Sequence, residues 1–127
     1  MSSPHPLDPL SAEEIEAAAE LARGACAPGA ALRFVSIDLR EPPKAEVLAF
    51  RGEEVLARRA NVVLHLRDER VVVQAVVSLS DGTVESWRRR ADAQSPLTVT
   101  ELLQCEETVR ADERWQAAMR RRGIEDL

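Results

Sequence analysis

The hydrophobic positions near the N-terminus recur every three or four residues, which is the period of an amphipathic helix. Ile15, Ala18 and Ala22 fall on one face of this helix, and charged residues fall on the other. Ser11 directly precedes the pattern and Glu14 follows Ser11 by three positions, which is the capping-box arrangement of helix starts. The pattern predicts a capped helix whose alanine-rich face lies close to a neighbouring layer.

From residue 32 onward the period changes to two, which is typical of strands with one buried face. Short turn-forming segments interrupt the alternation, among them Pro42-Pro43, Asp68-Glu69 and Ser80-Asp81-Gly82. Short connections between consecutive strands favour an antiparallel meander, with the helix across one of its faces. The predicted strands cover residues 32–39, 45–50, 60–66, 71–79 and 83–89. Residues 4–9, with their spaced prolines, are expected to be extended.

The C-terminal part of the chain predicts two more helices. After a polar stretch at residues 88–95, which we interpret as a linker, Thr98 and Glu101 form a second capping box. Asp112 interrupts the helix and caps a shorter one, and Gly123 ends it at a position suited to a Schellman closure.

Composition narrows the class of protein. The 127 residues are 45% apolar and 31% charged, with a net charge of −5, as in an ordinary globular domain. No apolar run reaches the roughly 20 residues of a membrane helix, and the first residues lack the apolar core of a signal peptide. We therefore expect a cytoplasmic protein without a membrane partner. The acidic balance argues against nucleic acid as a partner.

Few residues in the sequence are candidates for catalysis, cofactor binding or metal binding. His5 and His65 are the two histidines, too few for a three-histidine metal site, and each is expected to be a solvent-facing or hydrogen-bonded side chain. There is no Gly-rich phosphate loop, C-x-x-C pair or G-x-S-x-G motif. Cys26 and Cys105 are widely separated, and the sequence leaves open whether they pair. We assign no catalytic, cofactor-binding or metal-binding residue.

Several segments, in order, resemble one known family. They are residues 5–15, the proline-broken stretch 38–44, and, in the helical pair, Pro96-Leu97-Thr98, Cys105-Glu106-Glu107, Arg110-Ala111-Asp112 and Arg121-Arg122-Gly123-Ile124. Together they resemble the N-terminal, non-catalytic region of bacterial copper-containing primary amine oxidases, and the resemblance extends over nearly the whole chain.

The resemblance implies an α+β fold with two domains. Residues 4–90 would be the family's N2 domain, a cystatin-like arrangement of one helix on a four- to five-stranded antiparallel sheet. Residues 95–127 would be the helical start of the N3 domain, a second α+β domain that is incomplete here. The implied partner is the amine oxidase catalytic domain, in the same chain or as a separate one. The implied role is structural, covering that domain and framing the substrate entrance.

The family's reaction is the oxidative deamination of primary amines by oxygen. The resemblance implies copper held by three histidines, a quinone (topaquinone) made from a tyrosine, and an aspartate base. This sequence contains no Tyr and only two His. No family catalytic or metal residue can be placed on it, so the chain alone is expected to be inactive and to carry no cofactor.

A second reading is a free-standing cystatin-like binding or protease-inhibitor module. Residues 74–78 are similar to the Q-x-V-x-G loop of cystatins, but Ser78 stands where the glycine would be and the segment falls within a predicted strand. Trp87 and Trp115 are interpreted as core or interface anchors. The basic runs 88–90 and 120–122 each end an element, and the second complements a helix dipole.

The predicted C-terminal helices carry a large apolar face. Burying each large side chain is worth roughly 1.5–3 kcal/mol, so this face favours being covered. Folding back on the first domain, self-association into a homodimer, and capture by the rest of an oxidase would each cover it. We expect either a concentration-dependent dimer or helices that exchange amide hydrogens faster than the sheet. The residues of this face are Leu102, Leu103, Val109, Trp115 and Met119.

Overall fold

The computed structural model describes residues 5–52 and 56–126. It divides into two compact units, one within Met1–Ser95 and one within Pro96–Leu127, and each is described by itself. The first predicted domain begins at Pro4 and the second ends at Leu127, and both of these residues lie outside the described ones.

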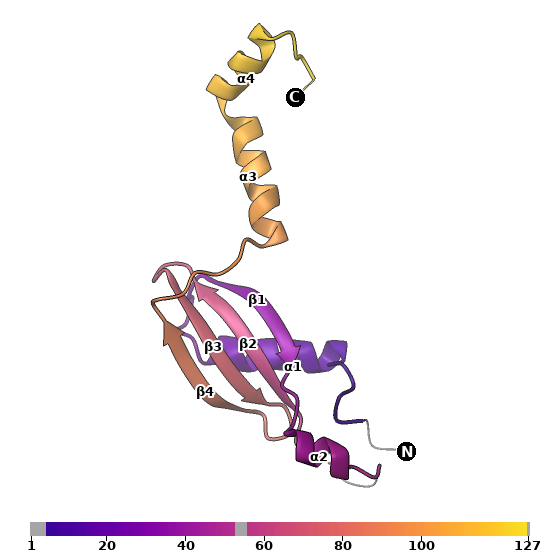
Figure 1. Cartoon of the computed structure of the whole chain (residues 1–127). Coiled ribbons are helices and arrows are strands. Elements are labelled where there is room, and N and C mark those ends of the chain that lie inside the picture. The colour runs from indigo at the N-terminus through magenta and orange to yellow at the C-terminus, as the bar shows by residue number, and fades with distance from the viewer. Residues whose placement is uncertain (1–4, 53–55, 127) are drawn as a thin grey trace. The chain divides into compact units, whose positions relative to one another are not determined.

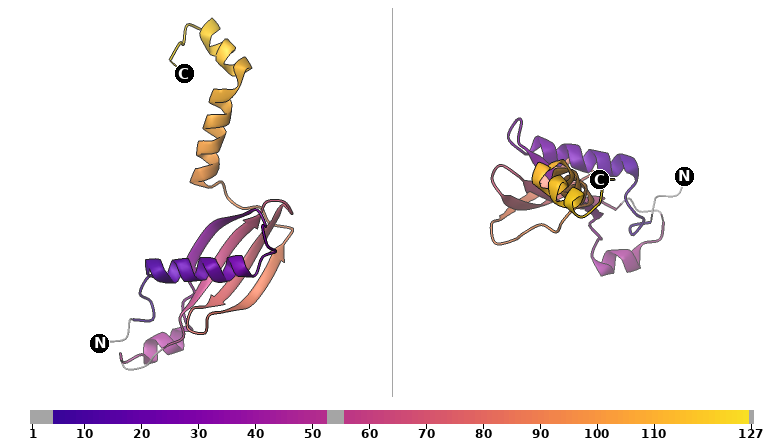
Figure 2. Two further views of the ribbon diagram at one scale, coloured as in Figure 1. Left: turned by 180° about the vertical axis from the view of Figure 1, so that it is seen from behind. Right: turned by 90° about the horizontal axis from the view of Figure 1, so that it is seen from above.

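The first unit is an antiparallel sheet with a helix across one face. Its strands are β1 (Leu32–Leu39), β2 (Arg59–Leu66), β3 (Val71–Ser78) and β4 (Thr83–Arg90), in the spatial order β1-β2-β3-β4. Helix α1 (Ala12–Gly24) crosses the sheet on the side away from the viewer in Figure 1 and in front of it in Figure 2, left. This confirms the α+β class and the antiparallel meander.

The core lies between α1 and the sheet because every second strand residue faces the helix. In β2 the buried and half-buried residues alternate strictly, as expected for a strand with one covered face. Ala18 and Ala22 of α1 are fully buried, so the helix backbone approaches the sheet closely. The core side chains from the sheet include Ala60, Val62, Leu64, Leu66, Val71, Val73, Ala75 and Val77.

Helix α1 begins as its sequence predicts. The Glu14 amide donates to the Ser11 hydroxyl at 3.2 Å, and the Ser11 amide donates to the Glu14 carboxylate at 2.9 Å. The expectation that Ile15 shares the buried face with Ala18 and Ala22 is wrong, because its side chain is 39% exposed. Ile15 therefore lies at the margin of the contact.

The predicted strand at residues 45–50 is wrong. Residues 45–49 belong to helix α2 (Lys44–Ala49), which follows Pro43 directly, and Phe50 is the residue after its end. Lys, Ala, Glu and Leu are good helix formers, and β1 already pairs with β2, so no place between them remains for another strand. The sheet accordingly has four strands among the described residues, the lower number of the expected range.

The N-terminal arm is also not extended throughout, as was expected for residues 4–9. The Asp8 amide donates to the His5 carbonyl at 2.9 Å, and the His5 amide donates to the Asp8 carboxylate at 2.7 Å. Pro6 suits the second position of such a turn because its φ is already fixed near the required value. The turn at Gly82, where φ is +66°, is as predicted.

The second unit is a pair of consecutive helices, α3 (Val99–Ala111) and α4 (Glu113–Arg121). The Thr98 capping box is present, and the Asp112 carboxylate accepts from the Trp115 amide at 2.9 Å. The Ile124 amide donates to the Met119 carbonyl at 3.1 Å, so the Schellman closure is confirmed. None of the described helices is long and apolar enough to cross a bilayer.

Candidate functional site

The histidines do not lie together in a metal centre. His5 packs edge-on against Phe50, with ring centroids 5.5 Å apart. His65 lies in β2, on the sheet face away from α1, between Arg33 of β1 and Val72 of β3. Within residues 5–52 and 56–126, no three His, Cys, Asp or Glu side chains are placed to hold a metal ion. The described residues therefore do not fit the copper site that the family resemblance implies.

The two cysteines are both free, which answers the question that the sequence left open. Cys26 is half-buried and its thiol donates to the Ala22 carbonyl at 3.4 Å. Burial, with a smaller contribution from the Glu69 carboxylate, raises the pKa of this thiol. Cys105 is exposed on α3. A raised pKa favours the thiol over the thiolate, which is the nucleophilic form of cysteine.

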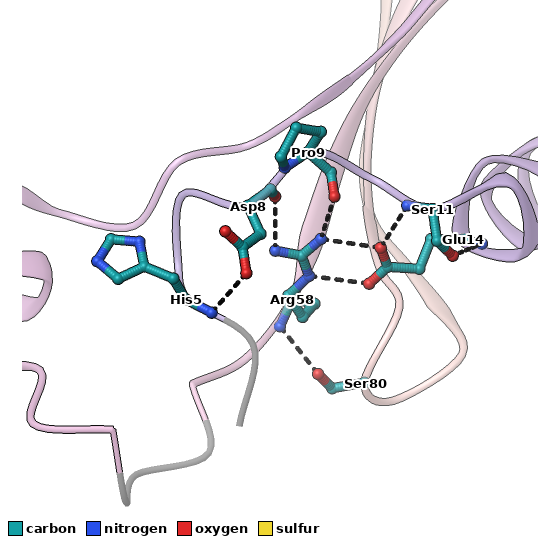
Figure 3. A network of polar contacts seen from close by, with 7 residues as sticks. All are labelled: His5, Asp8, Pro9, Ser11, Glu14, Arg58 and Ser80. Carbon is teal, nitrogen blue, oxygen red and sulfur yellow. Dashed lines mark hydrogen bonds and ion pairs between the residues drawn. The ribbon is translucent and has the colours of Figure 1, made fainter. Parts of the chain in front are cut away.

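A polar network around Arg58 links side chains and main-chain carbonyls of the first unit (Figure 3). Arg58 Nε donates to Glu14 Oε1 and Arg58 Nη2 donates to Glu14 Oε2, both at 2.8 Å. Arg58 Nη1 also donates to the Asp8 carbonyl at 3.0 Å, and Nη2 donates to the Pro9 carbonyl at 3.2 Å. The Arg58 amide donates to the Ser80 hydroxyl at 2.9 Å.

This network joins three separate parts of the first unit. Glu14 belongs to α1, Asp8 and Pro9 to the N-terminal arm, and Ser80 to the β3–β4 turn. The Arg58 guanidinium holds the pKa of the Glu14 carboxyl below its usual range, against a smaller opposing effect of burial. Because four of the five guanidinium N–H groups donate to main-chain or carboxylate oxygens, the geometry indicates a structural clamp.

The sheet face that α1 leaves uncovered carries an open groove of about 950 Å³. Val63 and Val76 are half-buried there, with Gln74 opposite Val63 on the neighbouring strand. Two arginines line the groove: Arg88 lies opposite Gln74 in β4, and Arg40 directly follows β1. The groove therefore combines an apolar strip with amide and guanidinium groups. Its other lining residues are Asn61, Val62, Ser86, Trp87 and Arg89.

The two groove arginines differ from the other arginines of this sheet face. Arg59 is paired with Glu85 at 2.7 Å, and Arg90 is paired with Asp92 at 3.0 Å. Arg40 Nη1 instead donates to the neutral amide oxygen of Asn61 at 3.2 Å.

The Arg88 side chain has no ion pair or hydrogen bond with any residue that the structure describes. The sequence analysis named no groove. Its predicted strand 83–89 overlaps the stretch 88–95 that we interpreted as a linker, whereas β4 runs on to Arg90.

Other residues singled out in the sequence have ordinary structural places. Trp87 is half-buried against the core, in agreement with its interpretation as an anchor. The Arg89 side chain of the first basic run pairs with Glu69. Residues 74–78 lie inside β3 with Ser78 fully buried, so the cystatin-type inhibitory loop is not formed.

Comparison with known proteins places this geometry in a family. The chain is 39% identical over 124 residues to the primary amine oxidase of Arthrobacter sp. (strain P1), covering 97% of this chain and 19% of that protein. It is 32% identical over 125 residues to the primary amine oxidase of Klebsiella aerogenes, covering 97% and 16%. The chain thus spans less than a fifth of the length of these relatives.

A solved structure agrees at the level of the fold. The copper-containing benzylamine oxidase from Hansenula polymorpha superposes with a TM-score of 0.81 at 20% identity, covering 92% of this chain and 19% of that one. The family model described as "Copper amine oxidase, N2 domain" matches residues 5–89, which contain the α1–sheet unit, the Arg58 clamp and the groove. The chain therefore belongs to the copper amine oxidase N2 domain family.

Proposed function

We propose that this chain is a non-catalytic N-terminal module of a copper-containing primary amine oxidase, where it covers the catalytic domain and frames the substrate entrance. One observation supports the proposal most directly. Proteins named primary amine oxidase align with 97% of this chain but with only 16–19% of their own length. In the assembled enzyme, copper and the tyrosine-derived quinone supply the oxidative chemistry, and residues outside this chain hold them.

The second unit follows from the same proposal. We propose that residues 95–127 are the helical start of the N3-like domain and that residues 4–90 are the N2-like domain. The exposed α3 side chains, Leu102 and Leu103 at 56% each, support an apolar contact with further protein. The proposed partner is the oxidase catalytic domain, with a homodimer of this chain as the competing contact. A cytoplasmic location is part of the proposal, and fractionation of the source cells tests it.

A chimera tests the structural role. The N-terminal region of the copper methylamine oxidase of Arthrobacter sp. (strain P1), which is 39% identical to this chain over 124 residues, would be replaced by this chain or deleted. We expect the chimera to keep copper, quinone absorbance and methylamine oxidation. The deletion should retain less folded enzyme or show an altered KM. Equal kcat, KM and stability in the deletion and the chimera would contradict a covering role.

A further inference from the structure

The groove on the uncovered sheet face has the chemistry of a protein-binding surface. We propose that it binds an acidic segment of a partner protein in an extended conformation, with carboxylates at Arg40 and Arg88 and an apolar side chain between them on Val63 and Val76. The inference concerns the groove alone and holds whether or not the chain serves an oxidase.

The charges of this face point to an acidic occupant. Five arginines (Arg33, Arg40, Arg59, Arg88 and Arg90) lie on or beside this face. The carboxylates nearby are Asp38, Glu85 and Asp92, with Asp81 and Glu46 close enough to Arg59 to interact with its charge. Glu85 and Asp92 are already engaged by arginines. Arg40 and Arg88 have no carboxylate partner among the described residues. A planar guanidinium pairs best with a carboxylate, through two parallel hydrogen bonds.

The shape of the groove favours a polypeptide over a small anion or a nucleic acid. Small-molecule sites enclose most of their ligand, whereas this groove lies open along the sheet. Nucleic acids are held by many phosphate contacts, whereas only two guanidiniums without a carboxylate partner line the described part of this surface. In an extended segment every second side chain points to the same side. Such a segment can therefore place an apolar side chain on the strip and a charged side chain at each of its ends.

The register of the sheet fixes the spacing of the two carboxylates. The Arg40 side chain donates to Asn61 on β2. Arg88 lies two strands away from Asn61, on β4, and is displaced from it by two residues along the strand direction. Strand spacings of ~4.8 Å and a rise of ~3.4 Å per residue place Asn61 and Arg88 about 12 Å apart. In an extended chain, residues four apart point to the same side at about 13 Å. The occupant is therefore expected to read acidic-x-apolar-x-acidic.

A peptide titration followed by NMR tests this directly. The probe is acetyl-Glu-Thr-Val-Thr-Glu-amide, added to the ¹⁵N-labelled chain and compared with the same peptide carrying Lys in place of Glu. We expect shifts concentrated on the amides of Asn61, Val63, Gln74, Val76 and Arg88, with none for the lysine peptide. Shifts spread over arginines on other surfaces, or none at millimolar peptide, would overturn the proposal. Changes in the chemical shifts of α3 amides instead would show that the chain's own acidic helix occupies the groove, which would also overturn the proposal.

Matched variants separate the groove from general charge attraction. Arg40→Gln/Arg88→Gln should weaken binding about five-fold or more, since exposed ion pairs contribute up to about 1 kcal/mol each. Arg67→Gln/Arg121→Gln removes the same charge from exposed positions outside the groove and should leave the affinity unchanged. Equal affinities of the two double variants would contradict the assignment. Spectra of the free variants show that each remains folded.

Discussion

Glu14 and Arg58 are 44 positions apart in the sequence and meet in a two-pronged ion pair, with both N–O distances at 2.8 Å. Their side chains are only 28% and 15% exposed, so the pair is more protected from water than the others on the first unit. Because Arg58 also donates to two arm carbonyls, a single side chain ties α1 and the arm to the start of β2.

Removal of the Arg58 head group should destabilise the first unit. We expect Arg58→Leu to lower the free energy of unfolding by about 2 kcal/mol, because the Glu14 carboxylate and two carbonyls lose their donors. Urea unfolding measures the change. Arg89→Leu is the matched control, since Arg89 and its partner Glu69 are each half exposed. The control should lower the free energy of unfolding by at most about 1 kcal/mol. Equal losses in the two variants would contradict a larger contribution from the Arg58 network.

The same pair should make stability depend on pH. Arg58 lowers the folded-state pKa of Glu14 below its unfolded value, so the unfolded chain binds more protons between the two values. The stabilisation is therefore complete above the unfolded pKa and is lost as pH falls through the folded pKa. We expect Glu14→Gln to flatten the acid side of the stability–pH curve. Glu16→Gln, an exposed change on the same helix, should leave it unaltered.

The alanine face of α1 should not tolerate larger side chains. Ala18 and Ala22 are fully buried against the sheet, so Ala22→Leu would force the helix outward at a cost of about 1–3 kcal/mol. Ala17→Leu introduces the same side chain at an exposed position of α1 and should change stability by less than about 0.5 kcal/mol. Thermal unfolding of both variants compares them. A neutral Ala22→Leu would mean that the contact is looser than the structure indicates.

The second unit should open independently of the sheet. Thr98 caps α3 through Glu101, so Thr98→Ala should destabilise the helix by about 1 kcal/mol. Hydrogen exchange should then accelerate across α3 and remain unchanged in β2 and β3. Thr100→Ala is the control, because Thr100 lies inside α3, two residues after the capping position. Acceleration in the sheet as well would indicate that the two units unfold together.

Sedimentation addresses the expected dimer. Leu102 and Leu103 are each 56% exposed on α3, and Leu102→Ser/Leu103→Ser should abolish any concentration-dependent association. A monomer at all concentrations, with strongly protected α3 amides, would mean that the chain covers these residues itself.

The sequence by itself determined the features that depend on near neighbours. The caps at Ser11, Thr98 and Asp112 and the closure at Gly123 join groups within five residues, so their hydrogen bonds are readable from spacing. The alternation in β2 similarly indicated which residues enter the core, because successive side chains of a strand point to opposite faces.

The tertiary structure decided what depends on distant segments. Residues 45–50 are predicted as a strand, yet residues 45–49 lie in α2, because pairing of β1 with β2 leaves them no partner there. The Arg58–Glu14 pair and the Arg40–Arg88 groove arise only when strand register and loop closure bring separate segments together. No local pattern marks such contacts, because their free energy is gained only after the chain has closed the long loops between them.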